Sequence, residues 1–89
     1  MKEVKLLGER VKRERIAQGF KQKELAAKAA VSADALSSLE NGRPVTTKTL
    51  ARVLKAMGYG EALENLLPPP VPSPIDLQKL EGKQRQRVR

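Results

Sequence analysis

Apolar residues recur at helical spacing in five segments of the chain, and no segment shows the strict alternation typical of a strand. The most regular stripe follows a threonine cap, Thr46 or Thr47, and ends before Gly58. Its apolar positions fall at i, i+3, i+4 and i+7: Leu50, Val53, Leu54 and Met57. The shorter stripes are Leu7 and Val11 in 5–18, Leu25, Ala26 and Ala29 in 22–29, Leu36 and Leu39 in 33–41, and Leu63, Leu66 and Leu67 before Pro68. The pattern predicts an all-α fold of five helices around one core.

Residues 22–42 read as two short helices joined by a tight turn, and the other helices are expected to pack around them. Ser32 is a good N-cap for the second helix, and Asp34 lies in its first turn, where the helix dipole favours negative charge. Gly42 can end that helix in a left-handed conformation.

A family resemblance rests on this segment. The residues that carry it are Gln22, Glu24-Leu25-Ala26, Val31-Ser32, Leu36-Ser37, Leu39 and Glu40-Asn41-Gly42. With them the chain resembles, from about Leu6 to Leu67, the Cro/cI-type (xenobiotic-response-element-like, XRE) helix-turn-helix regulators of bacteria and phages. The resemblance implies a five-helix, lambda-repressor-like DNA-binding domain whose recognition helix is 33–41.

The resemblance carries two expectations about single residues. In the family, the arginine at this position of the first helix pairs with the glutamate of the Glu-Asn-Gly ending, so we expect Arg15 to meet Glu40 as a structural ion pair. The alternative is an exposed arginine. The turn departs from the family, because Ala30 stands where glycine is usual and does not readily take positive φ.

Composition narrows the functional classes. The 89 residues contain no cysteine and no histidine, which excludes disulfides and removes the usual general base and the commonest metal ligand. A domain this small leaves no room for a deep catalytic cleft. We therefore expect that the protein is not an enzyme and that it binds no cofactor or metal ion. No apolar run approaches the ~20 residues that span a bilayer, and no signal peptide is evident, so a cytoplasmic protein is expected. The net charge of +8 favours a polyanionic partner, either nucleic acid or an anionic membrane surface. The family resemblance implies double-stranded DNA.

The base-reading residues are expected on the outer face of the second helix, which a helix-turn-helix sets in the major groove. They are Ala33, Asp34, Ser37 and Ser38. Ala33 can contact a thymine methyl group, and Asp34 can accept a hydrogen bond from a cytosine amino group. The serine hydroxyls can donate to or accept from a base edge. Alternatively, Asp34 only interacts favourably with the dipole of its helix and reads no base. These short side chains predict modest base discrimination, to which DNA shape or the tail would have to add.

The expected phosphate-binding residues are Gln22, Lys23, Asn41, Arg43 and Lys48. The resemblance implies that Gln22 binds one phosphate together with backbone N–H groups at the start of its helix. The alternative for each residue is a solvated surface group or a simple helix end-cap.

The chain is expected to divide into a domain over 1–67, a proline-rich spacer over 68–74 and a tail over 75–89. The tail combines apolar positions that suit docking (Ile75, Leu77 and Leu80) with a basic end that forms a possible DNA-binding arm or stays solvated (Lys83, Arg85, Arg87 and Arg89).

These features predict a sequence-specific transcriptional regulator, expected to be a repressor that acts as a homodimer on a palindromic site. The apolar tail and the leucines before Pro68 are the candidate interface, with core packing as the competing explanation. An alternative class is an antitoxin-type protein that neutralises a partner protein through its tail while repressing its own operon. RNA binding is disfavoured, because Phe20 and Tyr59 are the only aromatic residues.

Overall fold

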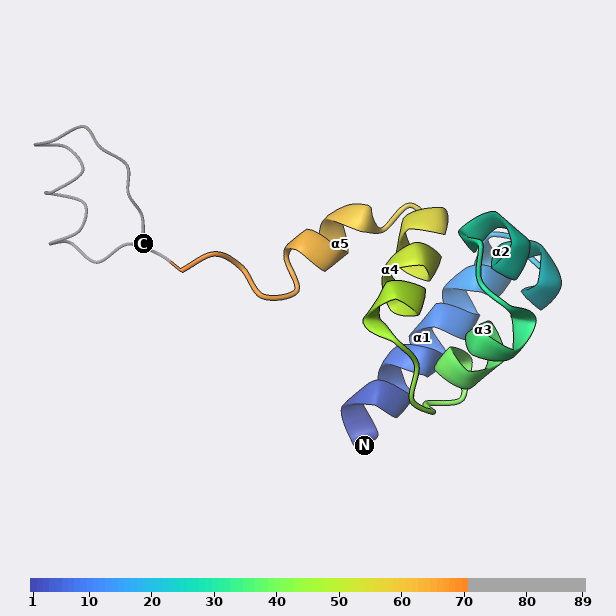
Figure 1. Cartoon of the computed structure of the whole chain (residues 1–89), viewed down its shortest axis with the longest axis horizontal. Helices are drawn as coiled ribbons and strands as arrows, with labels where there is room; N and C mark the ends of the chain where they lie inside the picture. The colour runs from blue at the N-terminus through green and yellow to red at the C-terminus, as the bar shows by residue number, and fades with distance from the viewer. Residues whose placement is uncertain (71–89) are drawn as a thin grey trace, which may run out of the picture.

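The computed structural model describes residues 1–70, which fold as an all-α domain (Figure 1). Its helices are α1 (Lys2–Ala17), α2 (Gln22–Ala29), α3 (Ala33–Glu40), α4 (Thr47–Ala56) and α5 (Gly60–Glu64). These residues contain no strand, and the predicted fold class is confirmed. Helix α1 begins before the predicted start at Lys5, because the Lys5 N–H already donates a hydrogen bond to the carbonyl oxygen of Met1 (3.1 Å). Helix α3 lies between α1, α2 and α4, whereas α5 packs on α4 at the side where the chain leaves the domain.

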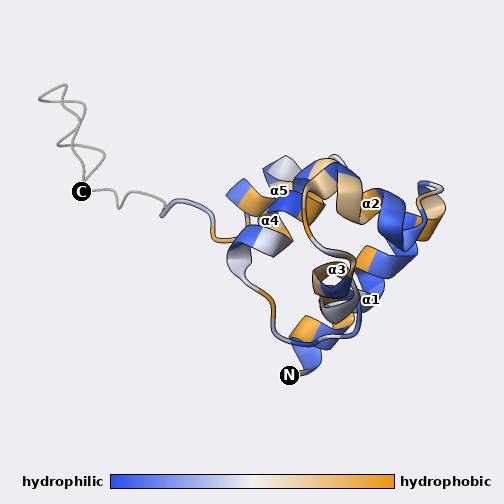
Figure 2. Cartoon of the chain, turned by 45° about the vertical axis from the view of Figure 1, so that its right-hand side comes forward, coloured by the Kyte–Doolittle hydropathy of each residue, from blue (hydrophilic) through white to orange (hydrophobic). Residues whose placement is uncertain are grey.

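The core is built from the apolar stripes that the sequence predicts. Leu25 and Leu36 of the helix-turn-helix and Val53 of α4 are fully buried, and Leu39 is 1% exposed. Burying one such side chain contributes about 1.5–3 kcal/mol, so these four residues supply much of the stability of so small a domain. The helices in Figure 2 carry both hydrophobic and hydrophilic residues, as expected of helices that bury one face and expose the other.

Two glycines bring the C-terminal end of α3 against α1. A Cβ atom at Gly8 would collide with the carbonyl oxygen of Leu39 and lie 2.9 Å from that of Glu40. At Gly42, which has a φ of 74°, a Cβ atom would lie 2.9 Å from the Cα of Lys5. The nearest atoms that a Cβ would meet at Gly8 and Gly42 belong to the backbone and cannot rotate away. A larger residue at either position would therefore have to displace a helix.

Helix α5 is shorter than predicted. It ends at Glu64, and the side-chain nitrogen of Asn65 donates to the carbonyl oxygen of Glu61 (3.0 Å). The expectation that Leu66 and Leu67 belong to this helix is wrong, since they follow it and are 73% and 87% exposed. Pro68 contributes to this, because a proline disfavours the helical conformation in the residue before it.

Candidate nucleic-acid interface

The helix-turn-helix consists of α2, a turn over 30–32, and α3. The Oγ of Ser32 accepts a hydrogen bond from the Ala35 N–H (3.0 Å), so Ser32 is the N-cap of α3. Ala30 adopts the left-handed conformation, with φ 60° and ψ 42°. Its carbonyl oxygen accepts a hydrogen bond from Nη1 of Arg52 in α4 (3.2 Å). The turn therefore has a conformation that favours glycine although its residue is alanine, and an arginine from α4 binds it.

A buried ion pair joins α1 to the last residue of α3. The Nε of Arg15 donates to Oε2 of Glu40 (2.6 Å) and Nη2 donates to Oε1 (3.2 Å). The two side chains are 10% and 3% exposed. The Nη1 of Arg15 donates to the carbonyl oxygen of Phe20 (2.9 Å), in the loop before α2. One arginine therefore connects α1, the start of the helix-turn-helix and its end.

Gln22, the first residue of α2, is bonded to the same carboxylate. Its Nε2 donates to Oε1 of Glu40 (3.1 Å), and the residue is half-buried. An amide nitrogen carries two N–H groups, so this bond leaves one of them free for another acceptor. The first backbone N–H groups of α2 lie at the same end of the helix and lack partners within it. Gln22, which is expected to bind a phosphate, is thus held to the core by one hydrogen bond and keeps a second side-chain N–H as a free donor.

The four expected base-reading residues differ in exposure. Asp34 is exposed, Ser37 and Ser38 are half-buried, and Ala33 packs partly against the core. Ala33 therefore offers DNA less of its methyl group than the sequence suggests. Within residues 1–70 the side chains of Asp34 and Ser38 form no hydrogen bond to the protein, so their polar atoms are free to meet a ligand.

Asn41 folds back on the end of α3. Its Nδ2 donates to the carbonyl oxygen of Ser37 (2.8 Å) and lies 3.4 Å from the Oγ of the same residue. This is the helix-capping arrangement that the sequence leaves open as an alternative for Asn41. This bond uses one N–H of the Asn41 amide, which leaves one for another acceptor. A phosphate contact by Asn41 stays a prediction.

The three expected phosphate-binding cations are exposed. Lys23 lies in the first turn of α2, Arg43 in the loop after α3, and Lys48 in the first turn of α4. The Arg43 backbone N–H donates to the carbonyl oxygen of Ser38 (2.8 Å), which fixes the start of that loop. The N-terminal ends of α2 and α4 add positive dipole ends to these charges. The proposed arm lies outside the described residues: Lys83, Arg85, Arg87 and Arg89.

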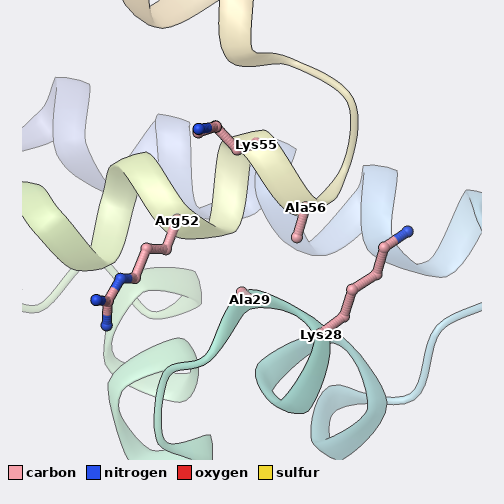
Figure 3. Close-up of a pocket in the computed structure, with 5 residues that line it drawn as sticks. All are labelled: Lys28, Ala29, Arg52, Lys55 and Ala56. Atoms are coloured by element: carbon pink, nitrogen blue, oxygen red, sulfur yellow. The ribbon is translucent and has the colours of Figure 1, made fainter.

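A second group of cations surrounds a shallow hollow of about 300 Å³ between α2 and α4, which we call the basic hollow. It is lined by Lys28, Ala29, Arg52, Lys55 and Ala56. Figure 3 shows the three cationic side chains pointing in different directions. Lys28 and Lys55 lie in the last turns of α2 and α4, where the helix dipoles favour positive charge, and Lys28 lies 5.0 Å from the centre of the Phe20 ring. Arg52 and Lys28 are engaged by the Ala30 carbonyl oxygen and the Phe20 ring, and the three cationic side chains do not converge on one anion.

Polar side chains also tie α1 to the corner between α4 and α5. The Nε2 of Gln18 donates to Oε2 of Glu14 and to the carbonyl oxygen of Met57, both at 2.9 Å. Hydrogen bonding to Glu14, and then the negative charge of that carboxylate, raise the pKa of Tyr59 above its ordinary value. The raised pKa keeps the phenol protonated and uncharged at neutral pH.

In residues 1–70 no three side chains of the His, Cys, Asp or Glu type gather to form a potential metal site. The same part of the chain has no helix that is both long and apolar enough to cross a bilayer.

Comparison with known proteins assigns the family. No curated protein and no solved structure matches the chain. A family model described as helix-turn-helix matches residues 11–63, more than half of the chain, and its span contains the whole of α2, α3 and α4. The match agrees with the five-helix fold, the capped recognition helix and the buried pair at its end. The chain belongs to the XRE-type, Cro/cI-like helix-turn-helix family of DNA-binding regulators.

Proposed function

We propose that the protein recognises a specific DNA site with α3 in the major groove and represses transcription by occupying it. The outer face of α3 carries the proposal: Asp34 and Ser38 have no partner within the described residues, while Leu36 and Leu39 bury the opposite face. A helix that is fixed by its inner face presents its outer side chains in one orientation, as base readout requires.

The proposed contacts divide into two classes. Base edges are read by one set on α3: Ala33, Asp34, Ser37 and Ser38. The phosphate backbone is held by a second set around it: Gln22, Lys23, Asn41, Arg43 and Lys48. Phosphate contacts fix the register of the protein and base contacts select the sequence, so the two classes have different consequences when they are removed.

A homodimer is the proposed active form, because one domain of this size offers few base contacts. Exposed apolar side chains after α5 support it. Leu66 and Leu67 are 73% and 87% exposed, and Tyr59, just before α5, is 41% exposed. Helix-turn-helix dimers bind half-sites about 34–36 Å apart, which is the spacing expected for a dimer formed when a second copy covers these residues.

The phosphate-binding face can be tested with two lysines of one helix. Lys48 lies in the first turn of α4 and Lys55 in its last turn, beside the basic hollow. We expect Lys48→Ala to weaken binding to every DNA duplex and to lower the slope of log K against log salt by about 1, because one counterion fewer is released. Lys55→Ala removes the same charge from the other end and should leave both quantities unchanged. Equal effects of the two changes would contradict the proposed face.

A partner-binding role is the second candidate, and the exposed Leu66 and Leu67 favour it. These residues lead directly into the proline-rich spacer (68–74) and the apolar–basic tail (75–89). An antitoxin-type protein would use this region to bind and neutralise a toxin while α3 represses the shared operon. The test compares the full chain with a version ending at Leu67 in co-purification with the product of the neighbouring gene. Retention that does not depend on the tail, or no retention at all, would contradict this role.

The same truncated version tests the division of the chain. If 1–67 is the complete domain, it should unfold at the same temperature as the full protein, because the core lies within it. A lower unfolding temperature would show that residues after Leu67 pack on the domain.

A further inference from the structure

We propose that the buried Arg15–Glu40 pair positions Gln22 for its phosphate contact, so that a core ion pair controls DNA affinity. This inference rests on the proposed function, since it requires a phosphate at the N-terminal end of α2. Neither Arg15 nor Glu40 needs to touch DNA in this account. Both act through the Gln22 amide.

The hydrogen bonds around Glu40 determine how that amide is turned. Oε1 of Glu40 accepts from Nη2 of Arg15 (3.2 Å) and from Nε2 of Gln22 (3.1 Å), while Oε2 accepts from Nε of Arg15 (2.6 Å). A carboxylate can only accept, so the Gln22 amide must face it with its nitrogen and turn its carbonyl oxygen elsewhere. The second N–H on that nitrogen is then available at the N-terminal end of α2. The carboxylate therefore selects one of the two amide orientations.

Arg15 allows this carboxylate to lie near an anion site. An unpaired Glu40 would repel a phosphate bound at the start of α2. The guanidinium neutralises it with two hydrogen bonds, and both side chains are nearly buried, at 10% and 3% exposure. The pair therefore orients Gln22 without presenting a net negative charge to DNA.

A purely structural role makes a different prediction. If the Gln22–Glu40 bond only joins α2 to α3, its loss lowers stability and leaves the affinity of the folded protein unchanged. If the pair acts through Gln22, its loss lowers affinity, and only while Gln22 is present. A double-mutant cycle separates the two roles.

The cycle compares four proteins: the wild type, Gln22→Met, Arg15→Met with Glu40→Leu, and the three changes together. Apolar residues replace both members of the ion pair because a buried pair exchanged in this way often leaves stability unchanged or higher. Binding is measured by fluorescence anisotropy on a mixed-sequence duplex of about 20 base pairs at low salt, since phosphate contacts do not depend on sequence. Circular dichroism first establishes that each variant is folded.

We expect Gln22→Met and the Arg15/Glu40 double change each to weaken binding about tenfold, and the triple change to weaken it less than about twofold further. The salt slope should stay unchanged in all four proteins, because the glutamine and the ion pair are both neutral. Wild-type affinity in the double variant, or the same loss with and without Gln22, would overturn the inference. Failure of the wild type to bind any duplex would instead contradict the proposed function.

A measurement on the wild-type protein keeps the inference testable if the double variant does not fold. The side-chain amide of Gln22 should be as rigid as the backbone, with an NMR order parameter of about 0.85, and its resonances should shift when the duplex is added. An order parameter below about 0.6 in the free protein, or no shift on DNA, would overturn it.

Discussion

The two sides of α3 are built in different ways. Its inner face and C-terminal end are enclosed by α1, with Gly8 against the backbone of Leu39 and Glu40 and with Arg15 paired to Glu40. The outer face carries Asp34 and Ser38, whose side chains meet no partner within residues 1–70. The contrast shows how a small domain can fix a helix by one face and its C-terminal end and leave polar side chains of the opposite face without contacts to the protein.

The largest effect is expected from removing the acceptor at the C-terminal end of α3. Glu40→Ala leaves Arg15 buried without a counter-charge and should lower the free energy of unfolding by about 3–5 kcal/mol, measured by urea denaturation. Glu9→Ala removes an exposed glutamate from α1 and should change it by less than about 0.5 kcal/mol. If the two variants have similar stabilities, the buried pair does not hold this end of α3.

The close approach of α1 and α3 predicts the next largest effect. Gly8→Ala places a methyl group against backbone carbonyls and should cost about 1–3 kcal/mol in urea unfolding. Gly60→Ala is the matched control, because a Cβ atom there lies 3.6 Å from its nearest neighbour and alanine favours a helix by up to ~1 kcal/mol. A stabilising effect at both glycines would show that the two helices are further apart than described.

A smaller effect of opposite sign is expected in the turn before α3. Ala30 has a φ of 60°, which costs an alanine about 1–2 kcal/mol relative to the right-handed conformation and costs glycine little. Ala30→Gly should therefore raise the free energy of unfolding by up to about 1 kcal/mol, after allowing for the greater freedom of glycine in the unfolded chain. Thermal unfolding measures it. A lower unfolding temperature would contradict the left-handed turn.

The smallest effect on stability is expected on the outer face. Ser38→Ala should change the free energy of unfolding by less than about 0.5 kcal/mol. It should instead alter the preference among DNA sequences by about 0.5–1.5 kcal/mol at one base pair, as expected for a single hydrogen bond, which competition binding with single-base variants of the site measures. A uniform loss across all sequences would assign Ser38 to the backbone contacts.

The sequence was sufficient to predict the helices and their inward faces, because stripes such as Leu50, Val53 and Leu54 follow directly from helical periodicity. The cap at Ser32 was predictable for a similar reason, since it rests on a local hydrogen bond, whereas the sequence left Thr46 and Thr47 as alternatives for the cap that Thr46 provides. The end of α5 was not, because the apolar periodicity continues through Leu66 whereas the helix ends at Glu64.

Contacts between distant segments were the harder part of the site. Arg15 and Glu40 could be paired only through the family resemblance, because they lie far apart in the chain. The role of Gly8 depends on a close backbone approach, and that of Arg52 on one free carbonyl oxygen, which leaves no pattern in the sequence. A glycine inside a strong helical stripe is the one signal that could have indicated Gly8.

We propose that α3 reads a particular DNA sequence. Fluorescence anisotropy of the full-length protein against the DNA upstream of its own gene and a scrambled duplex, repeated over a series of salt concentrations, tests it most directly. Both duplexes should show a steep dependence on salt, because lysines and arginines displace counterions from each. We predict that the upstream DNA binds about 10³-fold or more tightly than the scrambled duplex at every salt concentration. Equal affinities for the two duplexes would contradict the claim.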